Sequence, residues 1–162
     1  MSFDPTAHRM IAESRYLEDF EVGERFMSPS RTVTEAQFLA FQAASGDNHP
    51  IHYDREFCRR HGHADLLAHG FQVLIQSAAG AGIFPHLVED SLKAFIDQSS
   101  RFLAPVYAGD TLYPALEVVE VRPQRTTGVL TMRSTIHNQK GTLVMEGVQR
   151  YLLARRDPIL QA

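Results

Sequence analysis

The chain is poor in cysteine, has no large excess of charge of either sign, and contains no long uninterrupted apolar segment. Its one cysteine, Cys58, excludes an internal disulfide and a metal site built from several cysteines, which agrees with a reducing compartment. The 16 basic and 19 acidic side chains give a formal net charge of −3 at pH 7. This mild acidity argues against a nucleic acid or an anionic membrane as the main partner.

We also expect neither a targeting segment nor a membrane span. The first 16 residues are rich in charged residues and lack the apolar core of a signal peptide. The most apolar stretch, residues 66–88, is interrupted by histidine, glutamine and proline, which is unlike a membrane span. We therefore expect a soluble, cytoplasmic protein that binds neither nucleic acid nor membranes.

The composition is that of an ordinary globular protein. Of the 162 residues, 44% are hydrophobic and 22% are charged, and a chain of this length forms one domain by default. We find no internal repeat and no low-complexity tract. We expect an N-terminal arm at residues 1–16, a folded domain at 17–153 and a C-terminal tail at 154–162.

The clearest helix signal lies between Val33 and Gly46. Thr34 is a good N-cap residue, and Gln37 three positions later completes a capping box. Val33 and Phe38 are spaced for a hydrophobic staple across this cap. The sequence therefore predicts an amphipathic helix that starts after Thr34 and ends at Gly46.

Three further segments can be assigned before the chain reaches residue 85. A short strand is expected near residues 25–33, and a short helix over 55–61 that ends at Gly62. Residues 70–84 carry apolar side chains on every helical face, with frequent alanine and glycine. A helix that is apolar all round is buried, so this segment is expected to be one long central helix.

The second half of the chain reads as strands. Alternating or β-branched segments occur at residues 94–103, 112–122, 129–137 and 143–153, with a turn signal at 138–141. Four consecutive strands without intervening helices imply an antiparallel meander. The predicted fold class is α+β, with a curved antiparallel sheet wrapped around the central helix.

The most polar segment of the chain, residues 45–54, follows the first predicted helix. Asp47 and His52 lie five residues apart in this loop and can converge on one point. A carboxylate and an imidazole that share a water form a workable acid–base pair. The alternative is that Asp47 makes hydrogen bonds within a turn and His52 is a polar surface residue.

The histidines permit a second hypothesis, a metal site. Five of them fall between residues 49 and 69, and the pair His49 and His52 has a spacing that can chelate an ion. However, no cysteine partner or His-Glu-x-x-His motif is present, and Pro50 interrupts any helix there. We expect solvated loop histidines, no metal and no separate cofactor.

Gly70 stands at the predicted start of the central helix. The first N–H groups of a helix have no partner within it, and a glycine lets a ligand approach its backbone closely. An oxyanion placed there would be stabilised. The alternative is that Gly70 only eases a tight turn. Similarly, Arg101 can meet a phosphate or carboxylate, or join a surface ion pair.

Four segments, taken in order, resemble the MaoC-like dehydratases, the family of (R)-specific enoyl-CoA hydratases. They are Phe20-Glu-Val-Gly-Glu, the loop Ser45-Gly-Asp47 to Pro50-Ile51-His52, His69-Gly70, and the stretch from Arg101-Phe102 to Gly109-Asp110-Thr111. The likeness covers residues 17–153. It implies a hotdog fold, in which a curved antiparallel sheet surrounds one long helix, and a homodimer or higher homo-oligomer whose sheets join edge to edge.

The resemblance also implies an activity, the reversible addition of water across the 2,3 double bond of an enoyl-CoA thioester. Asp47 matches the catalytic aspartate and His52 the catalytic histidine, which together activate one water. Gly70 matches the glycine whose backbone N–H polarises the thioester carbonyl. The chain departs from the family at His49, where the family usually has asparagine, so His49 is a candidate for binding water or substrate.

Two other functions stay open at this point. One is a hotdog acyl-CoA thioesterase, and the other is a non-catalytic acyl-CoA-binding subunit. The acyl group cannot be derived from the sequence, and the residues that bind the CoA phosphates are candidates by charge alone. These candidates are Arg101, Arg122, Arg125 and Lys140.

Overall fold

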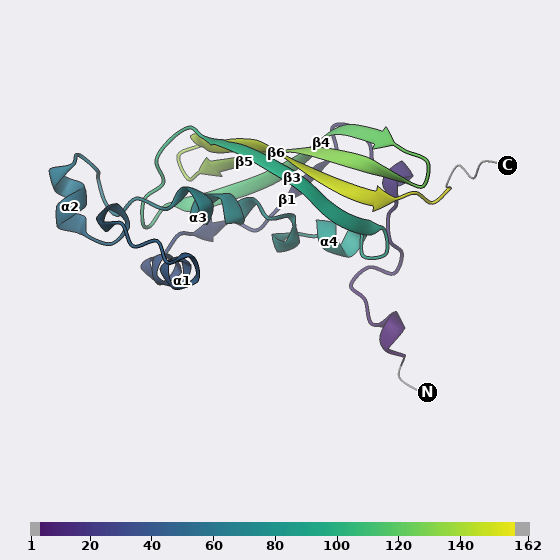
Figure 1. The fold of residues 1–162 in the computed structure, drawn as a ribbon, viewed down its shortest axis with the longest axis horizontal. Helices are drawn as coiled ribbons and strands as arrows, with labels where there is room; N and C mark the ends of the chain where they lie inside the picture. The colour runs from purple at the N-terminus through teal and green to yellow at the C-terminus, as the bar shows by residue number, and fades with distance from the viewer. Residues whose placement is uncertain (1–3, 158–162) are drawn as a thin grey trace.

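A computed structural model describes residues 4–157 and contains one curved antiparallel sheet with helical segments along one of its faces (Figure 1). Residues 1–3 of the predicted arm and residues 158–162 of the predicted tail lie outside the described residues. The predicted α+β class is confirmed. Within residues 4–157, no helix combines the length and the apolar character needed to cross a membrane.

The sheet has six strands, and every pairing in it is antiparallel. The strands are β1 (Arg25–Met27), β2 (Arg31–Thr32), β3 (Leu92–Phe102), β4 (Thr111–Pro123), β5 (Thr127–Asn138) and β6 (Leu143–Ala154). Their order is β1-β4-β5-β6-β3, with β2 beside β4. Four of the six strands therefore coincide with the four predicted from the second half of the sequence.

The predicted meander of four strands is wrong for β3. Only β4, β5 and β6 follow one another as neighbours, whereas β3 pairs with β6 and forms the edge of the sheet. The connection over residues 103–110 is long enough to cross the intervening strands, which lie about 4.8 Å apart. Alternation in a sequence indicates a strand but not its neighbour, so the edge position of β3 was not predictable from it.

The predicted strand at residues 25–33 is also divided. β1 and β2 both pair with β4, but residues 28–30 between them leave the ladder. Pro29 lies in this interruption, and proline has no N–H with which to continue the pairing.

The helix α1 (Glu35–Ser45) has the predicted ends. Thr34 and Gln37 form the reciprocal bonds of a capping box, and Gly46 ends the helix in the left-handed region with φ of 72°. Val33 and Phe38, the predicted staple, are both buried in one core cluster. The second predicted helix is α2 (Arg55–Arg60), and Gly62 follows it with φ of 81°.

The central segment is not one continuous helix. It consists of α3 (Gly70–Leu74), the 3₁₀ turns η4 (Ile75–Ser77) and η5 (Ala79–Ala81), and α4 (Phe84–Leu87). Ala78 is extended between η4 and η5, and Gly80 and Gly82 are poor helix formers. The segment nevertheless runs along one face of the sheet, as a central helix would (Figure 1).

Two faces of this central segment differ in burial. Val73, Ala79 and Phe84 are buried, the last two in the core cluster that includes β4, β5 and β6 residues. Phe71 and Ile75 instead expose 71% and 54% of their surface. The expectation that the segment is buried all round therefore fails on one face of the single chain.

Candidate active site

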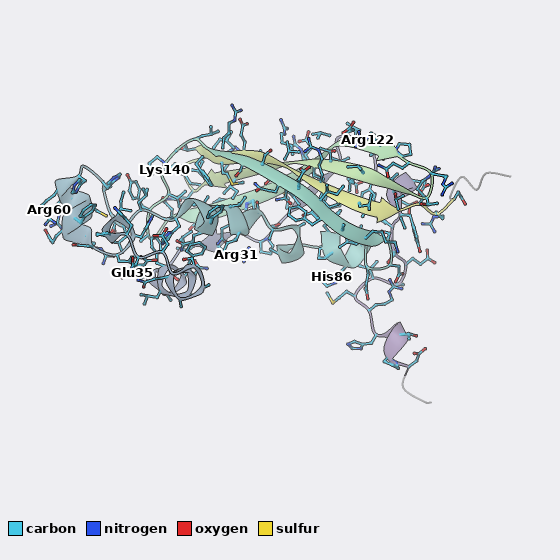
Figure 2. All side chains as sticks on the ribbon, viewed as in Figure 1. Arg31, Glu35, Arg60, His86, Arg122 and Lys140 are labelled. Atoms are coloured by element: carbon cyan, nitrogen blue, oxygen red, sulfur yellow. The ribbon has the colours of Figure 1, made fainter. Side chains whose placement is uncertain are left out.

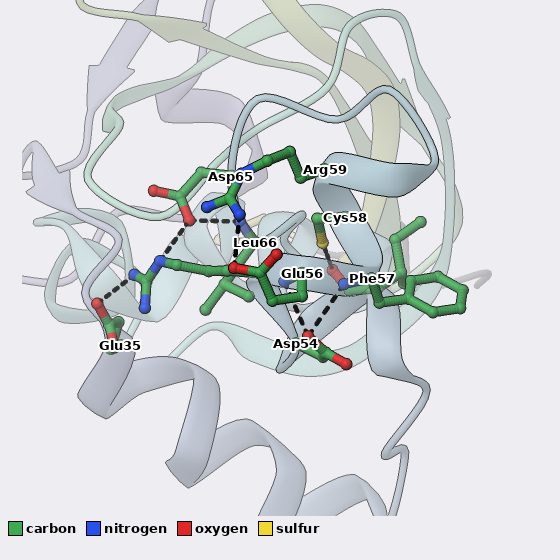
Figure 3. A network of polar contacts seen from close by, with 10 residues as sticks. Glu35, Asp54, Glu56, Phe57, Cys58, Arg59, Asp65 and Leu66 are labelled. Carbon is green, nitrogen blue, oxygen red and sulfur yellow. Dashed lines mark hydrogen bonds and ion pairs between the residues drawn. The ribbon is translucent and has the colours of Figure 1, made fainter.

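The loop between α1 and α2 carries the site and is anchored at both ends. The Asp54 carboxylate accepts hydrogen bonds from the backbone N–H groups of Glu56 and Phe57 and thereby caps α2. Arg55 contacts Glu35 at the start of α1 and Asp65 after α2, the latter at 2.9 Å (Figure 3). These contacts hold the two helices on either side of the loop.

Asp47 directly follows the residue that ends α1. One oxygen of its carboxylate accepts the backbone N–H of His49 at 3.3 Å, and the other accepts Nδ1–H of His69 at 3.0 Å. The hydrogen bond from His49 N–H, followed by that from His69, lowers the pKa of Asp47 below its usual value of 3.8. The side chain is therefore a half-exposed carboxylate at neutral pH.

His52 is held in one tautomer by the backbone. Its Nδ1 lies 2.6 Å from the carbonyl oxygen of Leu67, and a carbonyl can only accept, so Nδ1 carries the proton. Nε2 is then left with a free lone pair. The imidazole ring stacks on that of His69, with ring centres 3.5 Å apart and planes at 21°.

Asp47 and His52 meet as the sequence predicts. One ligand atom each of Asp47, His52 and His69 lies within 4.8 Å of the others. A single water at ordinary hydrogen-bond lengths of about 2.8 Å from two groups bridges a gap of this size. The arrangement therefore permits a carboxylate and an imidazole to act on the same water, which is the chemistry expected from their spacing.

These residues line a cavity of about 400 Å³. Its walls combine four polar or charged side chains with three aromatic rings, and they are formed by Phe41, Ser45, Asp47, His52, His69, Gly70, Phe71 and Phe102. A larger hollow of about 540 Å³ is lined by residues of β3, β4, β5 and β6. It contains the ion-paired Arg101 and Glu146 and no acid–base pair, so the smaller cavity is the better candidate for a site.

Gly70 lies in the wall of this cavity and begins α3. A Cβ atom at this position would be 3.1 Å from the ring of Phe102, so the close approach favours glycine. Because α3 has five residues, its macrodipole is small, and any stabilisation of an oxyanion there depends on the backbone N–H itself.

His49 is placed differently from the other predicted residues. Its Nδ1 accepts the backbone N–H of Ile51 at 3.3 Å and caps a 3₁₀ turn, η3 (Pro50–His52). Its ring meets Phe57 edge-on, with ring centres 5.6 Å apart, and it is not among the residues that line the cavity. The geometry favours a capping role, and a role in substrate binding stays a prediction.

Two residues of the site were not predicted as functional. His69 is 3% exposed, and its Nε2 lies 2.7 Å from the hydroxyl of Tyr53. Burial, and then the neighbouring His52, lowers the pKa of His69 below 6.5. Burial, and then Asp47, raises the pKa of Tyr53. The signals for them in the sequence are the His69-Gly70 segment of the family resemblance and the position of Tyr53 beside His52.

The site also changes the metal hypothesis. Among residues 4–157, the group that could converge on an ion is Asp47, His52 and His69, and it differs from the pair His49 and His52 whose spacing suggested the hypothesis. His69 uses its two ring nitrogens for Asp47 and Tyr53, so a metal would have to displace one of these hydrogen bonds. The donor set therefore suits hydrogen bonding better than metal binding.

The candidate phosphate ligands do not form one group. Arg122 and Lys140 lie toward opposite ends of the sheet (Figure 2). Arg101 pairs with Glu146 across β3 and β6. The charges predicted from the sequence therefore do not converge on a single phosphate site.

Comparison with known proteins identifies the family that the chain resembles. Residues 19–139 match the family described as the MaoC like domain. The chain is 27% identical over 130 residues to an (R)-specific enoyl-CoA hydratase from Aeromonas caviae, covering 80% of this chain and 92% of that protein. It is 31% identical over 102 residues to Protein MaoC from Klebsiella aerogenes, a match that covers 60% of this chain but only 29% of that longer protein.

Solved structures share the fold. A monoamine oxidase regulatory protein from Archaeoglobus has a TM-score of 0.82 and 30% identity, and the match covers 89% of this chain and 97% of that one. A conserved hypothetical protein from Mycobacterium tuberculosis, which has a double hotdog fold, matches with a TM-score of 0.72 and 26% identity. That match covers 92% of this chain and 46% of the other. The fold is therefore a hotdog fold.

Proposed function

Since the chain belongs to the MaoC-like domain family, we propose that it is a hydro-lyase that adds water to, or removes it from, the 2,3 double bond of an enoyl-CoA thioester. The observation that carries this proposal is the approach of Asp47 and His52 to within the span of one water in a cavity walled by Gly70. The A. caviae relative is named for hydration of this kind, and it supplies the substrate class.

The residues divide the reaction among them. Asp47 is a carboxylate and His52 has a free Nε2, so each can accept a hydrogen bond from the water. As the oxygen bonds to C3, one of the two groups takes a proton from the water and passes that same proton to C2, so the whole water is added and the pair returns to its starting state. The proton balance is closed within the pair, and no redox partner is required.

Addition at C3 places negative charge on the thioester oxygen. The backbone N–H of Gly70 is the donor that we assign to this charge, and one such donor contributes about 3 kcal/mol to stabilising a transition state. We propose that the reaction uses no metal and no cofactor, CoA being part of the substrate. We then expect exhaustive chelation of metals to leave the hydration activity intact. A loss of activity on chelation that added zinc restores would contradict the proposal that no metal is used.

We also propose a homodimer formed along β3, the edge strand. Its neighbourhood exposes apolar side chains that a single chain leaves uncovered, among them Phe71, Ile75, Phe95, Ile96 and Phe102. Strand edges that stay open invite pairing with another chain. This chain covers 46% of the double-hotdog neighbour, so two copies side by side would correspond to that longer protein.

The test is incubation of the protein with trans-2-enoyl-CoA thioesters of several chain lengths. Loss of absorbance of the conjugated thioester reports hydration, and a thiol reagent reports free CoA. The proposal predicts loss of absorbance without free thiol. Release of free thiol would instead identify a thioesterase, and no change with any substrate would favour an acyl-CoA-binding subunit.

A further inference from the structure

The His69 side chain is buried in the site and has contacts on both ring nitrogens and on one ring face. It is 3% exposed, both ring nitrogens have partners, and one face of the ring is covered by His52. Phe41 lies near it as well, with ring centres 4.7 Å apart. These contacts leave the His69 ring one orientation. The ring in turn restricts the positions of the side chains that it contacts, Asp47, Tyr53 and His52.

The direction of each hydrogen bond follows from chemistry. The Asp47 carboxylate can only accept, so Nδ1 of His69 carries the proton. Nε2 of the neutral ring is then an acceptor, and the Tyr53 hydroxyl donates to it at 2.7 Å; the main-chain oxygens of Asp47 at 3.1 Å and Phe38 at 3.5 Å are more distant acceptors for the same proton. The result is an ordered chain in which Tyr53 donates to His69 and His69 donates to Asp47.

From this geometry we propose that His69 is a positioning residue that fixes the Asp47 carboxylate beside His52, with the Tyr53 hydroxyl as the partner of Nε2 of His69. The proposal rests on the proposed function, since it assigns the support of the same water site. Asp47 is half-exposed on a loop, and without this contact only the His49 N–H would hold its carboxylate.

The neutral state of His69 is part of this role. The titratable groups that face its ring are Asp47, His52 and Tyr53. Burial and the neighbouring His52 lower the pKa of His69, so the ring is neutral at physiological pH. A neutral donor orients Asp47 while withdrawing less of its negative charge than an imidazolium would, and that charge is what accepts a proton from the water.

Two substitutions of His69 test the roles of its two ring nitrogens separately. The amide nitrogen of asparagine lies at about the position of Nδ1, so His69→Asn keeps a donor for Asp47. The longer glutamine reaches the position of Nε2, so His69→Gln keeps a partner for Tyr53 and loses the donor for Asp47. A role in packing alone predicts that glutamine, which is closer to histidine in volume, is tolerated better than asparagine.

The experiment compares kcat and KM for hydration of a trans-2-enoyl-CoA, with thermal unfolding as a check on folding. We expect His69→Asn to retain kcat within about threefold and His69→Gln to lose about tenfold or more, with KM changed little in both. A tenfold loss corresponds to about one hydrogen bond, ~1.4 kcal/mol. Equal loss in both variants, or none in either, would overturn the proposal.

A second measurement keeps the proposal testable if the wild type does not hydrate any enoyl-CoA, in which case the proposed function fails. The ¹⁵N shifts of the imidazoles report tautomers without any substrate. We expect His69 to be the Nδ1–H tautomer at pH 7.5 in the wild type and to become a mixture in Asp47→Ala, which removes the acceptor that holds the proton on Nδ1. An Nε2–H tautomer in the wild type would contradict the proposed chain.

Discussion

At the scale of single residues, the site depends on backbone partners that fix its side chains. Leu67 O sets the tautomer of His52, and His49 N–H holds one oxygen of Asp47. Neither partner can be replaced by a side-chain substitution, because both are main-chain groups. The catalytic geometry is therefore specified by how the loop and the segment before α3 fold, as much as by the residues that react.

The burial of His69 predicts a pH dependence of stability. Its pKa in the folded protein is lowered from 6.5, first by burial and then by His52. The unfolded chain therefore binds more protons at this residue, and stability present above pH 6.5 is lost as the pH falls through the folded-state pKa. We expect the free energy of unfolding, measured with urea, to fall more between pH 7.5 and pH 5.5 in the wild type than in His69→Asn. Equal losses would show that His69 does not contribute.

His49 gives a second prediction at this scale. Its Nδ1 accepts the N–H of Ile51, and an asparagine oxygen caps a turn in the same way. We expect His49→Ala to destabilise the protein by about 1 kcal/mol and His49→Asn to be nearly neutral, both with kcat close to the wild type. Denaturant unfolding and hydration assays check this. A large loss of kcat in both variants would restore the predicted role in the water or substrate site.

Elements whose signals are local were predicted well from the sequence. The ends of α1 follow from Thr34, Gln37 and Gly46, whose contacts span a few residues. The four long strands were found through alternation. The continuity of the central segment was not, since an apolar sequence does not show that Ala78 becomes extended and divides it. The neighbour of β3 depends on how residues 103–110 cross the sheet, which no periodicity encodes.

Gly46 provides a prediction at the scale of elements. It ends α1 with φ of 72°, a conformation that L-residues adopt with strain, and no neighbouring atom would meet an added Cβ. We expect Gly46→Ala to lower the free energy of unfolding by about 1 kcal/mol for this backbone reason alone. Gly80→Ala is the matched control, because Gly80 also has open space but no positive φ.

Urea unfolding of the two variants measures the difference. We expect Gly80→Ala to lie within about 0.5 kcal/mol of the wild type. Equal stability of both variants would mean that the end of α1 tolerates a side chain and that the loop carrying Asp47 is less constrained than the contacts indicate.

At the scale of the whole molecule, several exposed apolar residues belong to the edge strand β3, among them Phe95, Ile96 and Phe102. Ile96 of β3 and Leu39 of α1 are both exposed, at 46% and 61%, but only Ile96 belongs to the edge strand. We expect the wild type and Leu39→Glu to sediment with the mass of two chains and Ile96→Glu to shift toward one. A dimer that survives Ile96→Glu but not Leu39→Glu would place the interface elsewhere.

The tertiary packing of the whole molecule also explains which site residues could be predicted from the sequence and which could not. Asp47 and His52 lie in one loop, and Gly70 was found through the resemblance of its segment to the family. His69 contacts Asp47 across 22 residues and Tyr53 across 16, so these contacts arise only when the central segment packs beside the loop. His69 belongs to the His69-Gly70 segment of the family resemblance, but that pattern does not show which residues its ring contacts, and the local pattern around Tyr53 carries no such signal.

The central claim is that Asp47 and His52 act on the same water. The most direct test is kcat for hydration of a trans-2-enoyl-CoA by Asp47→Asn, His52→Gln and the double variant. We expect each single substitution to lower kcat by about 10² or more, and the double variant to be little worse, because the two groups serve one step. Near-wild-type kcat in either single variant, or a double variant whose loss equals the product of the two, would contradict the account.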